Sequence, residues 1–134
     1  MNDTMSNHKR RILVIGRSIP LIEGVADLLQ VVGHPVDVSS SWAETEYAMY
    51  DVPPGLVIID LSIAAADVYH FAEEIHRTPH WSDVPILFLS FSGDDRIRDL
   101  QRRNQRNGDR RVYFYAHTLL GMDELLDTVR ACMA

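Results

Sequence analysis

The sequence of 134 residues lacks several features that would place it outside the reducing interior of a cell. It has a single cysteine, Cys132, and therefore forms no internal disulfide. No apolar run approaches the roughly 18 residues of a membrane span, and residues 1–9 lack the apolar core of a signal peptide. These absences predict a cytoplasmic protein that does not contact membranes. Residues 1–9 are polar and aperiodic, so we expect a mobile amino-terminal tail before a single domain over residues 10–134.

The sequence also lacks glycine-rich phosphate loops. It contains neither a G-x-G-x-x-G fingerprint nor a Walker motif. The stretch from Gly16 to Pro20 offers one serine, Ser18, and the hydroxyl-rich loop typical of flavin binding is missing. We therefore predict no bound nucleotide or flavin cofactor.

Lysine is nearly absent, and arginine supplies twelve of the thirteen basic residues. The net charge of −6 argues against general nucleic-acid binding. Residues 96–111, however, hold seven arginines against two aspartates, which gives this window +5 and the remainder −11. Such a window is either a solvated helix face or a docking surface for an acidic protein, and the sequence leaves both open. The arginines are Arg96, Arg98, Arg102, Arg103, Arg106, Arg110 and Arg111.

Short apolar runs alternate with amphipathic segments along the chain. The expected strands are residues 12–15, 35–39, 56–59, 86–89 and 112–116. Three of these runs are apolar at every position, which is typical of strands buried on both faces. Apolar positions at helical spacing follow each strand, although the arginine-rich helix has only Ile97 and Leu100 as anchors. The alternation predicts a doubly wound, five-stranded parallel sheet in a three-layer α/β sandwich.

In a sheet of this kind, ligands bind beyond the carboxyl ends of the strands. Asp60 follows the third strand and Ser90 ends the fourth. The remaining candidates there are Gly16 and Arg17 after the first strand, and His117 and Thr118 after the fifth.

The chain from Arg11 to Met133 resembles a response-regulator receiver domain, the flavodoxin-like fold of the chemotaxis Y protein. The closest match is residues 56–61, which look like the strand that ends in the phosphoacceptor aspartate. Asp67 resembles the aspartate before the third helix of the family, residues 83–90 resemble its fourth strand, and residues 123–130 resemble its last helix. The resemblance implies a CheY-like module of two-component signal transduction.

By this resemblance, Asp60 is the phosphoacceptor equivalent, and Ser90 takes the place of the hydroxyl at the end of the fourth strand. Tyr115 takes the place of the switch aromatic. A bound Mg²⁺ would be held by Asp60 and by the backbone carbonyl of Ser62. From the residues alone, Ser90 is also a capping hydroxyl and Tyr115 a half-buried strand aromatic, and these interpretations stay open. His76 and His80 are expected to be solvated rather than metal-binding, because Pro79 breaks the helical spacing between them.

The departures from the family pattern predict an atypical receiver. Gly16 and Arg17 stand where the family has two metal-holding acids, and Thr118 stands where it has a lysine. One carboxylate is a poor Mg²⁺ site, and a fixed arginine cation repels the ion. We therefore predict no metal, no catalytic residue and no enzyme activity, with Arg17 pairing with Asp60 instead.

The favoured function is a stand-alone pseudo-receiver that acts through protein contacts. Its expected partner is a signalling protein or a second copy, bound through the fourth-helix, fifth-strand and fifth-helix face that the family uses. The first alternative is a phosphorelay regulator whose Asp60 accepts phosphate from a histidine kinase. The second is a flavodoxin-like binder of a small anionic ligand held by Arg17.

Overall fold

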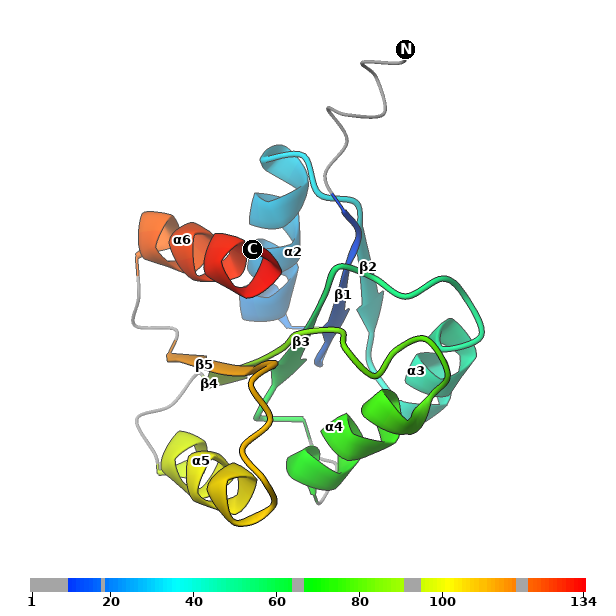
Figure 1. Ribbon diagram of the computed structural model, residues 1–134. Helices are drawn as coiled ribbons and strands as arrows, with labels where there is room; N and C mark the ends of the chain where they lie inside the picture. The colour runs from blue at the N-terminus through cyan, green and yellow to red at the C-terminus, as the bar shows by residue number, and fades with distance from the viewer. Residues whose placement is uncertain (1–9, 18, 64–66, 91–94, 118–120) are drawn as a thin grey trace.

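The computed structural model describes residues 10–17, 19–63, 67–90, 95–117 and 121–134. Within these ranges strands and helices alternate from β1 to α6 (Figure 1). The strands are β1 (Ile12–Ile15), β2 (Val36–Ser39), β3 (Leu56–Asp60), β4 (Ile86–Ser90) and β5 (Tyr113–His117). The helices are α2 (Pro20–Val31), α3 (Trp42–Ala48), α4 (Val68–Arg77), α5 (Arg96–Arg106) and α6 (Met122–Met133).

The five strands form one parallel sheet in the order β2-β1-β3-β4-β5. The strand β3 is therefore central, and β2 and β5 are the edges. Every residue of β1, β3 and β4 is buried, which confirms the prediction drawn from their continuous apolar runs. The fold class predicted from the sequence, a doubly wound five-stranded parallel sheet, is confirmed.

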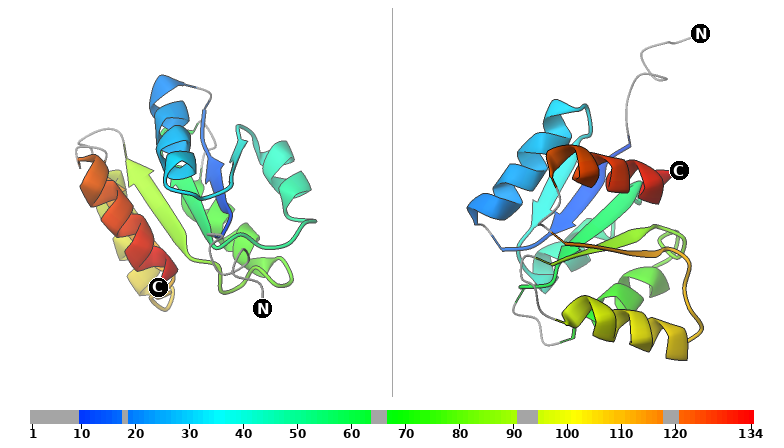
Figure 2. Two further views of the ribbon diagram at one scale, coloured as in Figure 1. Left: turned by 90° about the horizontal axis from the view of Figure 1, so that it is seen from above. Right: turned by 90° about the vertical axis from the view of Figure 1, so that its left-hand side faces the viewer.

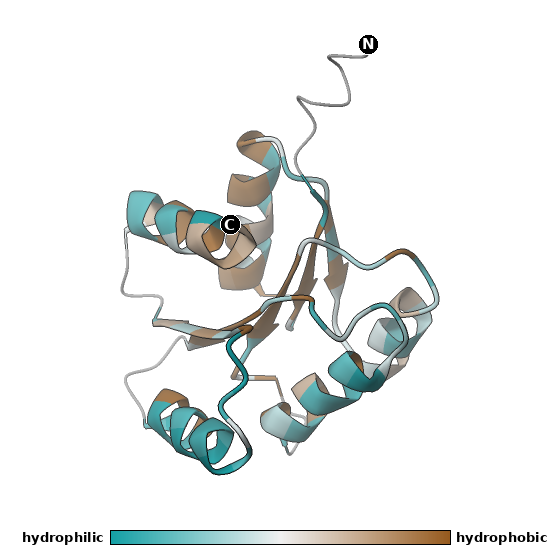
Figure 3. Cartoon of the chain, in the orientation of Figure 1, coloured by the Kyte–Doolittle hydropathy of each residue, from teal (hydrophilic) through white to brown (hydrophobic). Residues whose placement is uncertain are grey.

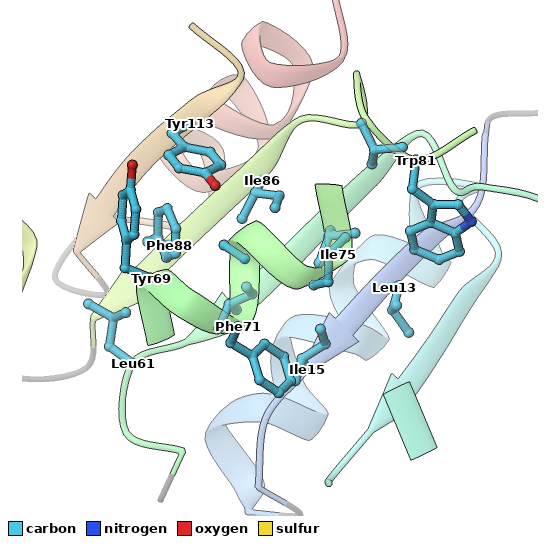
Figure 4. Packing of buried hydrophobic residues seen from close by; sticks show 14 of the residues in the cluster. Leu13, Ile15, Leu61, Tyr69, Phe71, Ile75, Trp81, Ile86, Phe88 and Tyr113 are labelled. Atoms are coloured by element: carbon cyan, nitrogen blue, oxygen red, sulfur yellow. The ribbon is translucent and has the colours of Figure 1, made fainter. Parts of the chain in front are cut away.

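Helices cover both faces of the sheet (Figure 2). One face packs against α2 and α6, with a core around Ile22, Leu29 and Val129. The other packs against α3, α4 and α5, with a more aromatic core that includes Tyr69 and Phe71 of α4 (Figure 4). The carboxyl end of β3, where Asp60 lies, is thus enclosed between two helical layers.

Two helices begin at capping side chains. Asp67 is the N-cap of α4, and its carboxylate accepts a hydrogen bond from the backbone N–H of His70 at 3.1 Å. Ser41 caps α3 by accepting from the Glu44 N–H at 3.1 Å. The Glu44 carboxylate reaches back to the N–H of Ser40, one residue earlier than a standard capping box requires.

The other boundaries differ slightly from those expected. The strand β5 runs one residue later than predicted, from Tyr113 to His117. The helix α2 begins with Pro20, after Ile19 as its N-cap residue, while Ser18 lies outside the described residues. The expected mobile tail, residues 1–9, lies outside them as well. No helix in the described ranges is long and apolar enough to span a membrane.

The expectation that His76 is solvated is wrong. Its ring is buried and stacks on Tyr113, with ring centroids 5.2 Å apart. Its Nε2 lies 2.8 Å from the carbonyl oxygen of Val84, which fixes Nε2 as the protonated nitrogen of the neutral ring. Burial lowers the pKa of His76, because the charged imidazolium would lose its hydration. His80 and His70, in contrast, are exposed.

Candidate functional site

Asp60 is the last residue of β3, and its side chain is completely buried. Both of its carboxylate oxygens accept from Ser62, two residues further along the chain. The Ser62 hydroxyl lies 2.8 Å from Oδ1 and 2.7 Å from Oδ2, and the Ser62 backbone N–H donates to Oδ1 at 2.9 Å. This is an Asx-type turn, in which the hydroxyl and the backbone N–H of one serine both donate hydrogen bonds to a buried carboxylate.

Arg17 reaches the same serine from the loop after β1. Its Nη2 donates to the Ser62 Oγ at 3.0 Å. The serine hydroxyl thus accepts from the arginine and donates to the aspartate, in the order Arg17, Ser62, Asp60. The direct ion pair expected between Arg17 and Asp60 does not occur among the described residues, because Ser62 lies between the two groups. The sequence placed Arg17 correctly at this end of the sheet but missed its partner.

Gly16 packs directly against Asp60. A Cβ atom at position 16 would lie 3.0 Å from the Asp60 Cβ and 3.0 Å from the Ile22 Cδ1. Those contacts are tighter than side chains normally make, so a larger residue at position 16 requires Asp60 or Ile22 to move. Glycine therefore lets β1 and the start of α2 close over the aspartate.

The described residues at this end of the sheet do not fit a divalent cation. Mg²⁺ in proteins is held by carboxylates and waters, with near-octahedral geometry. Among the described residues Asp60 is the one carboxylate in the arrangement, Ser62 already hydrogen-bonds it, and the Arg17 guanidinium lies against the same serine. Across the described ranges, no three His, Cys, Asp or Glu side chains are grouped closely enough to hold a metal ion.

The other residues predicted for this site lie at the neighbouring strand ends. Ser90 is buried at the end of β4, where it is aligned with His117 of β5, whose side chain is exposed. Tyr115 is half-buried in β5, and its ring stacks on Phe88 with centroids 5.5 Å apart. Burial raises the pKa of Tyr115 to about 12, so its phenol stays protonated at neutral pH. Thr118 lies outside the described residues.

Three of the seven arginines in the basic window hold the domain itself together. Arg96 donates to the carbonyl oxygen of Leu61 at 2.6 Å, directly after the candidate site. Arg103 places Nη1 at 2.9 Å from both carboxylate oxygens of Asp67, and its guanidinium lies over the Tyr69 ring, 4.7 Å from the centroid. These contacts join α5 to the start of α4 and to the loop after β3.

The pKa of Asp67 reflects this arrangement. Partial burial works to raise it, but the hydrogen bond from the His70 N–H and the Arg103 guanidinium outweigh burial and hold the pKa below its usual value.

Arg110 is the third arginine of the basic window that bonds within the domain, and it donates to the Ser82 carbonyl oxygen at 2.8 Å.

The remaining four arginines are exposed. Arg98 and Arg102 lie 3.9 Å from the carboxylates of Asp95 and Asp99, on the turn before each, which is a weak surface pairing. Arg106 and Arg111 make no ion pair or hydrogen bond with another described side chain. Figure 3 shows that α5 is hydrophilic along most of its length, with apolar colour near its start. In the basic window, three arginines therefore form contacts within the domain and four are exposed on its surface. The sequence did not predict this division.

Comparison with solved structures identifies the fold. No protein-family model and no curated protein sequence matches this chain. Its backbone nevertheless has the fold of the CheY-like receiver domains of response regulators.

The chemotaxis response regulator CheY4 of Vibrio cholerae is similar with a TM-score of 0.73 at 16% identity, over 91% of this chain and 97% of CheY4. A CheY-like receiver domain protein from Methanospirillum hungatei has a TM-score of 0.74 at 12% identity, over 92% and 93% of the two chains. NtrX from Brucella abortus has a TM-score of 0.75 at 20% identity, over 92% of this chain and 26% of NtrX. The prediction of a receiver-type fold is thus confirmed.

Proposed function

We propose that this chain is a pseudo-receiver, a signal-transduction module that works through protein contacts and without Mg²⁺-dependent phosphorylation of Asp60. The observation that carries the proposal is the chain of hydrogen bonds from Arg17 through Ser62 to the buried Asp60 carboxylate. The Ser62 hydroxyl, itself bonded by the Arg17 guanidinium, occupies carboxylate oxygens that would otherwise be available to coordinate a metal ion.

The chemistry of phosphoryl transfer supports this proposal. Transfer to a carboxylate brings two anions together, and catalysis depends on positioning and on neutralising that charge. Two unit charges about 4 Å apart interact by roughly 4 kcal/mol at an effective dielectric near 20, so Arg17 opposes a divalent cation beside Asp60. Both carboxylate oxygens of Asp60 also accept from the Ser62 hydroxyl, which lowers their availability for attack on a phosphorus atom.

The module would transmit its state through its surface. We propose that the four exposed arginines on α5 and the segment before β5 form its docking surface for a signalling protein or a second copy, on the face built by α5, β5 and α6. We expect the protein to act in the cytoplasm, with no enzyme activity of its own. Nucleic acid is a poor match for a chain with a net charge of −6.

Intact-mass measurement tests the chemistry directly. Incubation with acetyl phosphate and Mg²⁺ should leave the mass of the wild-type protein unchanged, and beryllofluoride should leave the fluorescence of Trp42 and Trp81 unchanged. A Mg²⁺-dependent adduct that is lost in Asp60→Asn would overturn the proposal. It would favour the alternative, a phosphorelay regulator that takes phosphate from a histidine kinase.

A gain-of-function variant tests the role of Arg17. Arg17→Asp supplies a second carboxylate and removes the cation, so Mg²⁺ should raise the melting temperature of this variant but not that of the wild type. Arg77→Asp, at an exposed arginine on α4, is the matched control and should show no Mg²⁺ response. The single change is preferable to one that also replaces Gly16, because a Cβ there collides with Asp60. Equal Mg²⁺ responses in the wild type and Arg17→Asp would contradict the proposed role of Arg17.

A further inference from the structure

An unusual set of exposed aromatic and aliphatic side chains lies at the β2 edge of the sheet. Tyr47 of α3 is 81% exposed, and Tyr50 and Val52, which follow the helix, are 91% and 73% exposed. They border two adjoining cavities of about 670 and 650 Å³, one between β2 and α3 and the other between the end of α3 and the turn after α4. Tyr50 and Asp51 line both cavities. We call this surface the tyrosine groove.

The tyrosine groove is acidic. Its two cavities are lined by four carboxylates and one arginine, Arg11, which pairs with Asp37 at 2.8 Å and more loosely with Asp51 at 3.9 Å. The groove therefore carries about three uncompensated negative charges beside exposed phenol rings. The carboxylates are Asp37, Glu44, Glu46 and Asp51.

A matching basic feature lies on α5. Arg98, Arg102 and Arg106 are spaced four residues apart, so they form a row along one side of the helix. At a rise of 1.5 Å per residue, the row has a cation about every 6 Å over about 12 Å. All three side chains are exposed, and the row is called the arginine ridge below. Arginine suits such a groove, because its guanidinium both pairs with carboxylates and stacks on aromatic rings.

The arginine ridge and the tyrosine groove cannot meet within one molecule. Figure 1 shows α3 and α5 at opposite ends of one helical layer, with α4 between them. The ridge is basic and the groove is acidic, so a contact between two copies pairs the ridge of one with the groove of the other. The groove of the first copy and the ridge of the second then remain free to bind further copies.

We propose that the arginine ridge of one copy docks in the tyrosine groove of a second copy, so that the protein associates head to tail. This proposal rests on the docking role of α5 put forward above, and it is independent of the chemistry at Asp60. The predicted contact is heterologous, in contrast to a symmetric dimer in which α5 would face α5. Charge complementarity supports the second copy as the occupant, since the ridge presents three arginines, two of them weakly paired at 3.9 Å with Asp95 and Asp99, to a groove with about three uncompensated negative charges.

Two charge-reversal variants test the proposal by complementation. Arg102→Glu disrupts the arginine ridge and leaves the tyrosine groove intact, whereas Asp51→Arg disrupts the groove and leaves the ridge intact. The wild type should form species larger than a dimer as its concentration rises in analytical ultracentrifugation. Each variant alone should associate at least about tenfold more weakly. An equimolar mixture of the two should form a species of two chains and stop there, because one intact ridge and one intact groove remain to pair.

Matched reversals on other helices provide the controls. Arg130→Glu on α6 and Asp27→Arg on α2 change the same charges at exposed positions and should associate as the wild type does. Raising the salt from about 0.1 M to about 1 M shortens the screening length from roughly 10 Å to roughly 3 Å, so it should dissociate the wild-type assembly. Thermal melts should show that all four variants fold.

Three results would overturn the proposal. The wild type could stay monomeric at about 1 mM, or the mixture of Arg102→Glu and Asp51→Arg could fail to pair. Alternatively, Arg102→Glu could abolish association while Asp51→Arg leaves it intact, which is the result expected for a symmetric dimer through α5. In the last case the proposed docking role of α5 would be retained, and the proposed contact between α5 and the tyrosine groove would be rejected.

Discussion

Replacing Ser62 by alanine removes the hydroxyl that joins Arg17 to the buried Asp60 carboxylate. The backbone N–H of residue 62 still donates to Asp60, but both oxygens lose the hydroxyl contacts of 2.7 and 2.8 Å. Water cannot compensate freely, because Asp60 is 0% exposed. The variant therefore leaves a buried charge with one hydrogen bond.

The size of the effect follows from that loss. A hydrogen bond to a charged group contributes about 1.5–3 kcal/mol to stability, so Ser62→Ala should lower the free energy of unfolding by about that amount. For a chain of this length this corresponds to a fall in melting temperature of roughly 5–15 °C. Arg17→Ala should cost less, under about 1 kcal/mol, because the Arg17 side chain is exposed.

Urea unfolding in a double-mutant cycle tests the reasoning. In the Asp60→Asn background the charge is gone, so Ser62→Ala should cost at least about 1 kcal/mol less than it does in the wild type. Ser82→Ala is the matched control, since Ser82 is exposed and its contact with Arg110 uses the backbone carbonyl. The mechanism is refuted if Ser62→Ala costs under about 0.5 kcal/mol, or costs the same in both backgrounds.

Three further predictions concern stability and can be measured by urea unfolding. Ile58→Ala, in the central strand, should cost about 2–5 kcal/mol because of the cavity that it leaves, whereas the exposed Val31→Ala should stay within about 0.5 kcal/mol. Asn104→Ala should cost about 1–3 kcal/mol, because the buried amide bonds the backbone of the turn after α5. The pKa of His76 is lowered in the folded state, so below about pH 6.5 the unfolded chain binds a proton at this residue and the folded chain does not. Stability should be full above that pH and decline below it, and His76→Phe should flatten the slope.

Local features of the chain could be predicted because their causes lie close together in the sequence. Four consecutive apolar residues before Asp60 specify a strand buried on both faces, and the aspartate then falls at its carboxyl end. Asp67 caps α4 because its carboxylate reaches the backbone N–H of His70, three residues along. Hydrophobic periodicity thus predicted the alternation of strands and helices, and with it the end of the sheet where Asp60 lies.

Contacts between distant parts of the chain could not be predicted in this way. In the sequence the seven arginines of the basic window look alike, yet Arg96 and Arg103 turn inward while Arg102 and Arg106 face solvent. That division depends on the side of α5 that packs against α4, where Arg103 finds the carboxylate of Asp67. The sequence around His76 does not predict its burial either. His76 is buried because β5 places the Tyr113 ring against it.

The candidate site shows both limits together. Position along the chain determined that Asp60, Gly16 and Arg17 would gather beyond the strand ends, since parallel strands share one carboxyl edge. Tertiary structure decided how they connect. Ser62 stands between the two charges because the turn after β3 points its hydroxyl at Asp60 while the loop after β1 delivers Arg17 from 45 residues away. A hydrogen bond requires atoms within about 3 Å, and only the packed chain sets distances that small between residues so far apart in sequence.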